Sequence, residues 1–413
     1  MTALRNSNFR RFLIGTGTSL LGDCAAAPAI ALAVLARTGS AGALGAVLAA
    51  RVIPVVALLL VGGVLGDRWS RRTMMISADL VRCAVQATMA ALLAFGPNWI
   101  WPLILLQALA GAATAMFTPG ITGFIRQICA PEELASGNGL RGIVQSLALI
   151  AGPLCAAGLV VTVGAQAAVG LDALSFGVSA LCLARIKTVA MVARPPGHSM
   201  ARDLVDGWHE FTARRWVWAT ISVASVANLS YATFCVLGPV LARQRHQPGT
   251  WPLLLSAFGV GAVCGAALAT QWRPARPLRT GLLMVCLFAA QPFAMALAGG
   301  ALPVVLGGFA GGLGLMTFNP MWETTLQRHV PTGVLSRISA YEWFGSYLGQ
   351  PIGYLTAASF AAHIGIRNAL LTIGVVQVVT SLVPLFARDV RELPAEPASD
   401  KAGRCGLPTG DRV

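Results

Sequence analysis

The chain has 413 residues, of which 56% are hydrophobic and only 11% are charged. Soluble domains carry roughly 25% charged residues, so this composition excludes a disordered chain, a solvated nucleic-acid-binding domain and an ordinary soluble enzyme, and leaves a membrane protein with many spans. The net charge of +14 would suggest a nucleic-acid partner in a soluble protein, but in a membrane protein its meaning depends on where the basic residues fall.

Apolar stretches of roughly 20 residues, the length that crosses a bilayer as a helix, recur along the chain. We therefore predict an all-α membrane protein with twelve transmembrane helices. They cover residues 12–36, 42–66, 74–95, 99–123, 138–163, 166–187, 216–242, 251–272, 280–299, 301–325, 337–361 and 364–386. The first stretch follows a basic N-terminus, as in a secretory signal peptide, but it is too long for the apolar region of such a signal, and further spans follow it.

The basic residues fall mainly on one side of these spans. With the N-terminus in the cytoplasm, 24 of the 30 Lys and Arg residues lie on the cytoplasmic side, and Arg82 lies within the third span. The outer side receives Arg37, Arg51, Arg243, Arg245 and Arg367. Because cytoplasmic loops are enriched in Lys and Arg, we predict a multi-pass protein of the cell membrane with both termini in the cytoplasm and no nucleic-acid partner.

The chain repeats itself at an offset of about 200 residues. Phe117-Thr118-Pro119 in the fourth span matches Phe318-Asn319-Pro320 in the tenth. A parallel repeat of six helices builds the secondary transporters that have two halves. We predict an N-terminal half at 1–187, a cytoplasmic linker with an amphipathic segment at 188–215, a C-terminal half at 216–388 and a disordered cytoplasmic tail at 389–413.

A short basic loop, Gly62-Gly63-Val64-Leu65-Gly66-Asp67-Arg68-Trp69-Ser70-Arg71-Arg72, joins the second and third spans. It resembles the signature loop of the major facilitator superfamily. The matching residues are Gly63, Leu65, Asp67, Arg68, Arg71 and Arg72, while Ser70 stands where the family usually has glycine. The resemblance implies the two-half fold and a conformational latch, in which Asp67 contacts the start of the eleventh span near Arg337 and holds the cytoplasmic side shut. The alternative is an ordinary basic loop with an incidental aspartate.

Further stretches resemble the drug-efflux branch of this superfamily, which contains macrolide and siderophore exporters. They include Ser19-Leu20-Leu21-Gly22-Asp23, Asp172-Ala173-Leu174-Ser175-Phe176 and Ser336-Arg337-Ile338-Ser339-Ala340. The helix motif of the superfamily's exporters is matched in the fifth span at three of its six positions, Gly139, Gly152 and Pro153. Small residues of this kind also serve simply to pack a membrane helix.

Charged residues within the spans are costly and therefore candidates for function. Asp23 lies roughly 16 Å into the first span at 1.5 Å per residue, and a lone carboxylate at this depth is a candidate for proton coupling, with structural hydrogen bonding as the alternative. Asp79 and Arg82 stand at i and i+3 in the third span and predict an intramembrane ion pair. Asp172, near the outer end of the sixth span, is interpreted as an anchor for the outer loops.

Arg141 and Glu342 lie at similar depths in opposite halves and are candidates for a gate between the halves, although each could pair locally instead. The family resemblance implies that spans one, four, seven and ten line a central cavity. Besides Asp23, the cavity candidates are Gln107, Thr114, Phe117, Asn228, Tyr231, Met316, Asn319 and Trp322. Aromatic, methionine and amide side chains suit a large, mostly apolar substrate.

We therefore predict a monomeric membrane transporter, without a cofactor or metal, that exports an amphipathic small molecule by alternating access with protons as the second substrate. The nine cysteines show no metal-ligand spacing, and the chain contains no phosphate-binding G-x4-G-K-[ST] segment that would indicate ATP-driven transport. Two alternatives remain: an importer or facilitator of a nutrient or lipid-like solute on the same fold, and a membrane-embedded enzyme or sensor. The absence of clustered His, Cys or carboxylate side chains disfavours the last.

Overall fold

The computed structural model describes residues 2–68, 70–97, 99–129, 133–186, 208–209, 212–272, 274–297, 299–330 and 332–395. Several side chains within 59–68, 118–126 and 332–340 lie outside this description. The described residues form helices and connecting turns, with no strand among them. Ten helical segments are long and apolar enough to cross a membrane, and Trp101–Phe117 is a further, shorter apolar segment. The molecule is therefore an all-helical, multi-pass membrane protein.

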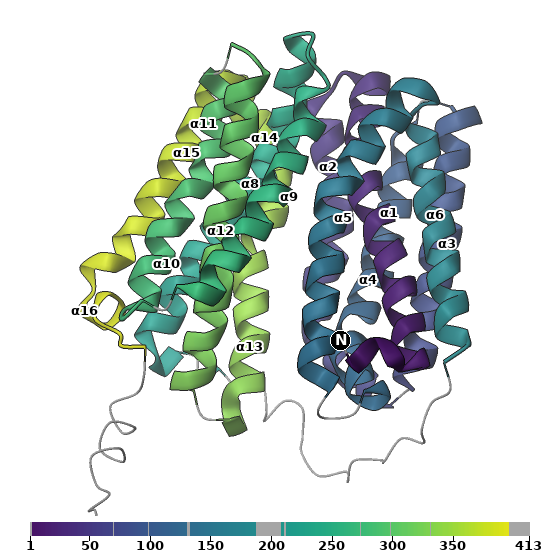
Figure 1. The fold of residues 1–413 in the computed structure, drawn as a ribbon. Coiled ribbons are helices and arrows are strands. Elements are labelled where there is room, and N and C mark those ends of the chain that lie inside the picture. Colours follow the sequence, from purple (N-terminus) through teal and green to yellow (C-terminus); the bar gives the residue numbers. More distant parts are fainter. Residues whose placement is uncertain are drawn as a thin grey trace, which may run out of the picture.

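Six helices form the N-terminal half. They are α1 (Ser7–Thr38), α2 (Ala41–Arg68), α3 (Arg71–Phe95), α4 (Trp101–Ile128), α5 (Leu134–Thr162) and α6 (Ala165–Ala184). The second half consists of α8 (Arg215–Gln244), α9 (Thr250–Gln271), α10 (Pro277–Val285), α11 (Ala290–Leu297), α12 (Ala301–His329), α13 (Thr332–Tyr347), α14 (Gly349–Ile364) and α15 (Ile366–Leu382), followed by the short α16 (Arg388–Arg391). Figure 1 shows the two bundles side by side.

Two of the predicted single spans are interrupted, each next to a proline. The ninth consists of α10, a 3-10 turn at Cys286–Ala289 and α11, and the eleventh is divided into α13 and α14 at Leu348. Pro292 and Pro351 have no N–H with which to bond the carbonyl four residues earlier. At the first break, Nε2 of Gln291 donates to the freed carbonyl of Phe288 at 3.5 Å.

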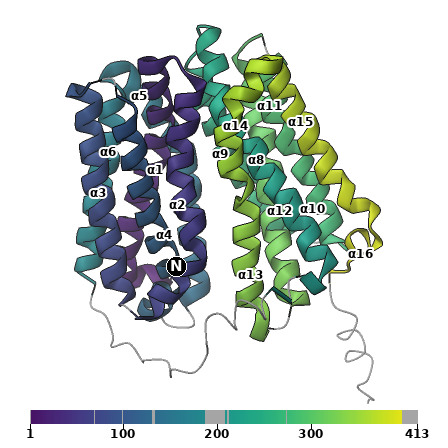
Figure 2. The same ribbon diagram turned by 180° about the vertical axis from the view of Figure 1, so that it is seen from behind.

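The two halves touch at one end and diverge toward the end that carries the N-terminus (Figures 1 and 2). Close backbone contacts hold the touching end together. Gly45 of α2 lies against the carbonyl of Tyr354 in α14, and a methyl group added at Gly259 of α9 would lie 2.8 Å from the backbone of Leu149 in α5. Ala49 of α2 belongs to the same buried apolar cluster as Phe234 and Leu254 of the second half, so this end is packed like a core.

Basic side chains cap helix ends on both sides of the molecule. At the touching end, Arg37 donates to the carbonyls of Leu92 (2.9 Å) and Leu93 (2.7 Å) of α3. Arg245 donates in the same way to the last carbonyls of α11. A cation at a helix C-terminus satisfies free carbonyls and the negative end of the helix dipole. Arg37 lies in the last turn of α1 and Arg245 directly follows α8, the first helices of their respective halves, so the internal repeat extends to this contact.

The predicted linker and tail are described only in part. Residues 187–207 and 210–211 lie outside the described chain, and with them most of the predicted amphipathic segment. The Trp208 ring lies 5.7 Å from that of Tyr341 in α13. The tail, predicted to be disordered from residue 389, begins with α16, whose Val390 is buried in the core of the second half. Residues 396–413 lie outside the description.

Candidate functional site

A pocket of about 280 Å³ lies within the second half, between α8, α12 and α13. Its walls are mostly apolar and include the aromatic side chains of Phe318, Trp322, Trp343 and Tyr347. Polar groups enter from α8 and α12 through Asn228 and Asn319, and none of the lining residues is basic. Such a concave, mostly apolar site with a few convergent polar groups is the usual form of a small-molecule site.

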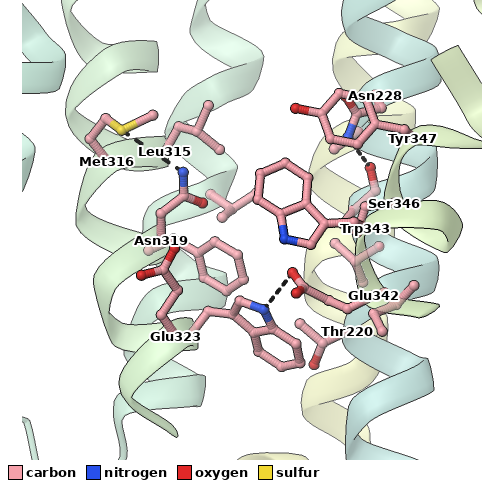
Figure 3. Close-up of a pocket in the computed structure, with 17 residues that line it drawn as sticks. Thr220, Asn228, Leu315, Met316, Asn319, Glu323, Glu342, Trp343, Ser346 and Tyr347 are labelled. Atoms are coloured by element: carbon pink, nitrogen blue, oxygen red, sulfur yellow. Dashed lines mark hydrogen bonds between the residues drawn. The ribbon is translucent and has the colours of Figure 1, made fainter. Parts of the chain in front are cut away.

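Two carboxyl groups face this pocket from opposite walls. Figure 3 shows Glu323 reaching in from α12 and Glu342 from α13. Nε1 of Trp322 donates a hydrogen bond of 2.9 Å to Oε1 of Glu342. Glu323 is exposed and forms no ion pair with any described residue. The pocket therefore combines aromatic surface with uncompensated negative charge.

A second cavity, of about 380 Å³, lies between the two halves. The N-terminal half contributes Asp23, Arg51 and Gln107, and the second half contributes Tyr231 and Tyr354. Asp23 is the one carboxyl group among the residues that line it, and its side chain is 25% exposed. This cavity adjoins the packed contact of α2 with α14, where the halves meet.

Asp23 is not the lone carboxylate that the sequence suggested. Its Oδ1 atom lies 2.5 Å from an Nη atom of Arg51 in α2, and its Oδ2 atom lies 3.9 Å from Arg82 in α3. The sequence placed Arg51 on the outer side of the membrane, and that placement is wrong. Arg51 lies roughly 15 Å from the start of α2, at 1.5 Å per residue, and its guanidinium group contacts Asp23. α2 and α3 thus each bring a guanidinium group to the carboxyl group of Asp23 in α1.

Arg82 links this pair to Asp79, with which it forms the i, i+3 ion pair. The guanidinium carbon of Arg82 also lies 4.3 Å from the ring centroids of both Phe117 and Phe176, an arrangement in which aromatic faces stabilise a buried cation. Phe117, a predicted cavity residue, is therefore part of the packed interior. Thr114, another candidate, lines neither cavity, and its hydroxyl donates to the carbonyl of Ala110 at 2.9 Å.

The other predicted cavity residues divide between the two sites. Gln107 and Tyr231 line the cavity between the halves together with Asp23. Asn228, Met316, Asn319 and Trp322 line the pocket of the second half. The sequence missed Arg51, Glu323 and the α13 side chains Trp343 and Tyr347. Glu323 sits near the inner end of its span, and the α13 residues belong to the eleventh span, which was not expected to line the cavity.

Asp172 is not an anchor for outer loops. It is fully buried, and its Oδ2 atom accepts a hydrogen bond of 2.5 Å from Nε2 of Gln86 in α3. The predicted gate is not formed in this conformation: no ion pair joins Arg141 to Glu342 within the described chain, and Nε of Arg141 is buried without a hydrogen-bond partner.

The packing of Gly63 and the side chains of Asp67 and Arg68 lie outside the description, and so does the contact with the eleventh span that was predicted for the latch. Arg71 begins α3. Arg72 caps α6 by donating from Nε to the carbonyl of Leu183 at 3.0 Å and from an Nη atom to that of Ala184. This capping contact within the N-terminal half is a role that the loop motif did not suggest.

In the predicted export motif, Gly152 lies directly against Cys24 of α1, where a larger residue would clash. Pro153 lines the cavity between the halves, whereas Gly139 faces open space. The part of the chain that the structure describes contains no group of three or more His, Cys, Asp or Glu residues able to hold a metal ion.

The chain is similar to transporters along most of its length. Residues 12–353 match the sequence profile of the Major Facilitator Superfamily. The multidrug efflux pump Tap of Mycobacterium tuberculosis is 28% identical over 96% of this chain and 98% of its own. Macrolide efflux protein A of Streptococcus pyogenes is 22% identical over 92% of this chain and 95% of its own.

Solved structures agree on the fold. The nucleoside transporter NupG has a TM-score of 0.72 at 12% identity, over 91% of this chain and 98% of its own. A bacterial homologue of the human lysosomal transporter Spinster has a TM-score of 0.73 at 13% identity, over 94% of this chain and 99% of its own. The profile match covers most of the chain and the helical architecture agrees with it. This protein therefore belongs to the major facilitator superfamily and is a membrane transporter, not an enzyme.

Proposed function

We propose that this transporter is a monomeric exporter of the cell membrane, with twelve spans and both termini in the cytoplasm, that moves amphipathic small molecules outward by alternating access. Its relatives are named as multidrug and macrolide efflux pumps. With the termini in the cytoplasm, the halves diverge on the cytoplasmic side, and the conformation described is the one that loads substrate from within the cell.

The C-terminal pocket carries the proposal for the substrate. Aromatic faces attract organic cations at about 0.5–2 kcal/mol, and a carboxylate strengthens a contact with a protonated amine. Trp322 and Trp343 supply the aromatic surface, Glu323 and Glu342 supply negative charge, and none of the residues that line the pocket is basic. We therefore assign the pocket to amphipathic molecules that carry a basic nitrogen.

Proton antiport would use Asp23. This carboxyl group lines the cavity between the halves and is partly exposed there, so it can exchange a proton with water in the cavity. In this conformation the guanidinium group of Arg51, at 2.5 Å, pairs with the carboxyl group of Asp23. A conformational change that moves Arg51 away would favour proton uptake, and it would thereby link protonation to the state of the halves.

The latch and the gate belong to the same cycle. Asp67, at the end of α2, would contact the start of α13 when the cytoplasmic ends of the halves close, and Arg141 would approach Glu342 in that state. The unsatisfied Nε atom of Arg141 supports the second contact, because a buried donor without a partner gains most from forming one.

The test is export by cells with and without the protein, using fluorescent aromatic compounds that are cationic, neutral or anionic but of similar size. We expect the cationic compounds to accumulate least in cells that contain the protein, and expect collapse of the proton gradient to abolish the difference. Asp67→Asn should lower the rate of export while the protein remains folded. Equal accumulation of all three compound classes, with or without the protein, would contradict the proposal.

A further inference from the structure

Five ionisable side chains meet in the middle of the N-terminal half, between α1, α2, α3 and α6. Three are carboxyl groups, Asp23, Asp79 and Asp172, and two are guanidinium groups, Arg51 and Arg82. Asp79, Asp172 and Arg82 are almost completely buried. If all five were charged, one negative charge would remain unbalanced, and burial of the kind found at Asp172 strongly disfavours an unpaired charge.

Both guanidinium groups are already paired. Arg51 lies 2.5 Å from Asp23. Arg82 is bound to Asp79 and lies 3.9 Å from the other oxygen of Asp23. No basic side chain in the described chain forms an ion pair with Asp172, so the unbalanced charge would fall there.

The hydrogen bonds around Asp172 fit the neutral acid better than the carboxylate. Oδ2 accepts from Nε2 of Gln86 at 2.5 Å. Oδ1 lies 3.3 Å from Oγ of Ser175, but the single proton of that hydroxyl serves the Asp172 main-chain carbonyl at 2.7 Å. A proton on Oδ1 would be donated to Oγ of Ser175, so that both carboxyl oxygens of Asp172 would take part in hydrogen bonds.

The backbone of α1 closes this site. A methyl group added at Gly22 would lie 2.6 Å from Oδ1 of Asp172, so no space for water remains on that side. Gly22 immediately precedes Asp23, whose carboxyl group lines the cavity between the halves. Asp172 is therefore packed against the same turn of α1 that presents Asp23 to the cavity.

We propose that Asp172 holds a proton in this conformation and that it is the proton exchanged in the transport cycle, a role that rests on the proposed antiport. Its transfer from Oδ1 of Asp172 to the carboxylate of Asp23 would release Arg51 from Asp23 and leave Arg51 to neutralise the new carboxylate of Asp172. The total charge of the five groups stays constant, and Asp23 can then lose the proton to the cavity.

Three substitutions in the same network test the protonation state. In Asp172→Asn, the amide oxygen accepts from Gln86 and the amide nitrogen donates to Ser175, so we expect the Tm at neutral pH to stay within about 2 °C of the wild type. Asp23→Asn and Asp79→Asn each remove the closest partner of a guanidinium group, and the Tm should fall by about 4 °C or more. A fall in Asp172→Asn as large as in the other two, or tolerance of Asp79→Asn instead, would overturn the assignment.

Infrared spectroscopy supplies a readout that does not depend on stability. The wild type at neutral pH should show the C=O stretching band of a protonated carboxyl group that Asp172→Asn lacks and that Glu392→Gln, at an exposed carboxyl group outside this network, keeps. Ser175→Ala should shift that band, because it removes the acceptor of the Oδ1 proton. A spectrum that is the same in Asp172→Asn and in the wild type would refute the proposal.

Transport separates this inference from the proposed function. With ethidium as the cationic probe in everted vesicles, Asp172→Asn should abolish uptake driven by a proton gradient. Wild-type rates in that variant would show that the proton on Asp172 is not the exchanged one. If the wild type itself does not move ethidium or any compound of the panel, the proposed function fails, while the Tm and infrared results still decide the protonation of Asp172.

Discussion

Trp322 and Glu342 are joined across the C-terminal pocket by a hydrogen bond of 2.9 Å from the indole nitrogen of α12 to the carboxyl group of α13. Trp322 is 5% exposed and packs between Phe318 and Trp216. The bond therefore joins a rigid aromatic wall to a charged group and keeps that group directed into the pocket.

Trp322→Phe should lower the free energy of unfolding by about 1–3 kcal/mol, because it removes a hydrogen bond to a charged group from a mostly buried site. Glu342→Gln keeps an oxygen acceptor for the indole and should cost less. Thermal unfolding of the purified protein in detergent measures both changes. An equal loss of unfolding free energy in the two variants would mean that the hydrogen bond from Trp322 to Glu342 does not stabilise the pocket wall.

Glu323→Gln should weaken export of cationic compounds about tenfold, which corresponds to roughly 1.4 kcal/mol of lost attraction. Export of neutral compounds of the same size should be unchanged, because the aromatic walls remain. Concentration-dependent export of matched cationic and neutral dyes measures the difference. Glu392→Gln, at an exposed acidic residue outside the pocket, is the control and should leave both unaffected.

Arg51→Gln should destabilise the protein by about 2–4 kcal/mol, since it leaves the carboxylate of Asp23 without its closest cation. The double variant Asp23→Asn with Arg51→Gln should lose less than the sum of the two single variants, because neither charge is then left alone. Unfolding free energies of the four proteins give the coupling energy. Strict additivity would show that the contact at 2.5 Å contributes nothing.

Gly45→Leu should shift the equilibrium between the conformations of the transporter away from the one in which α2 and α14 touch. Its side chain would enter the space taken by the carbonyl of Tyr354, where α2 and α14 touch. Spin labels placed at Thr38 and Gln247 of a cysteine-free protein should report longer distances at this end. Gly139→Ala, whose added methyl group meets nothing within 4 Å, should leave the distances as in the wild type.

The helical architecture follows from hydropathy, because a helix that crosses a bilayer needs a long apolar stretch wherever it occurs. Ten described helical segments that are long and apolar enough to cross a membrane follow the order of the predicted spans, and the family resemblance is confirmed by the profile match. The breaks at Cys286–Ala289 and Leu348 were missed. Their prolines are visible in the sequence, but proline also occurs within the unbroken helices α1, α2 and α5, so the residue alone does not predict a break.

The sequence by itself determined that this protein is a two-half membrane transporter, which residues are charged within its spans, and that Asp79 and Arg82 share a helix face. Only the tertiary structure decided which charges meet. Arg51 follows Asp23 by 28 residues and belongs to the next helix, and Glu342 belongs to a different helix from Trp322, yet both pairs are in contact. Periodicity relates residues within one helix, whereas contacts between helices depend on how the helices pack. Asp23, Asp172 and Glu342 each have a partner on a neighbouring helix.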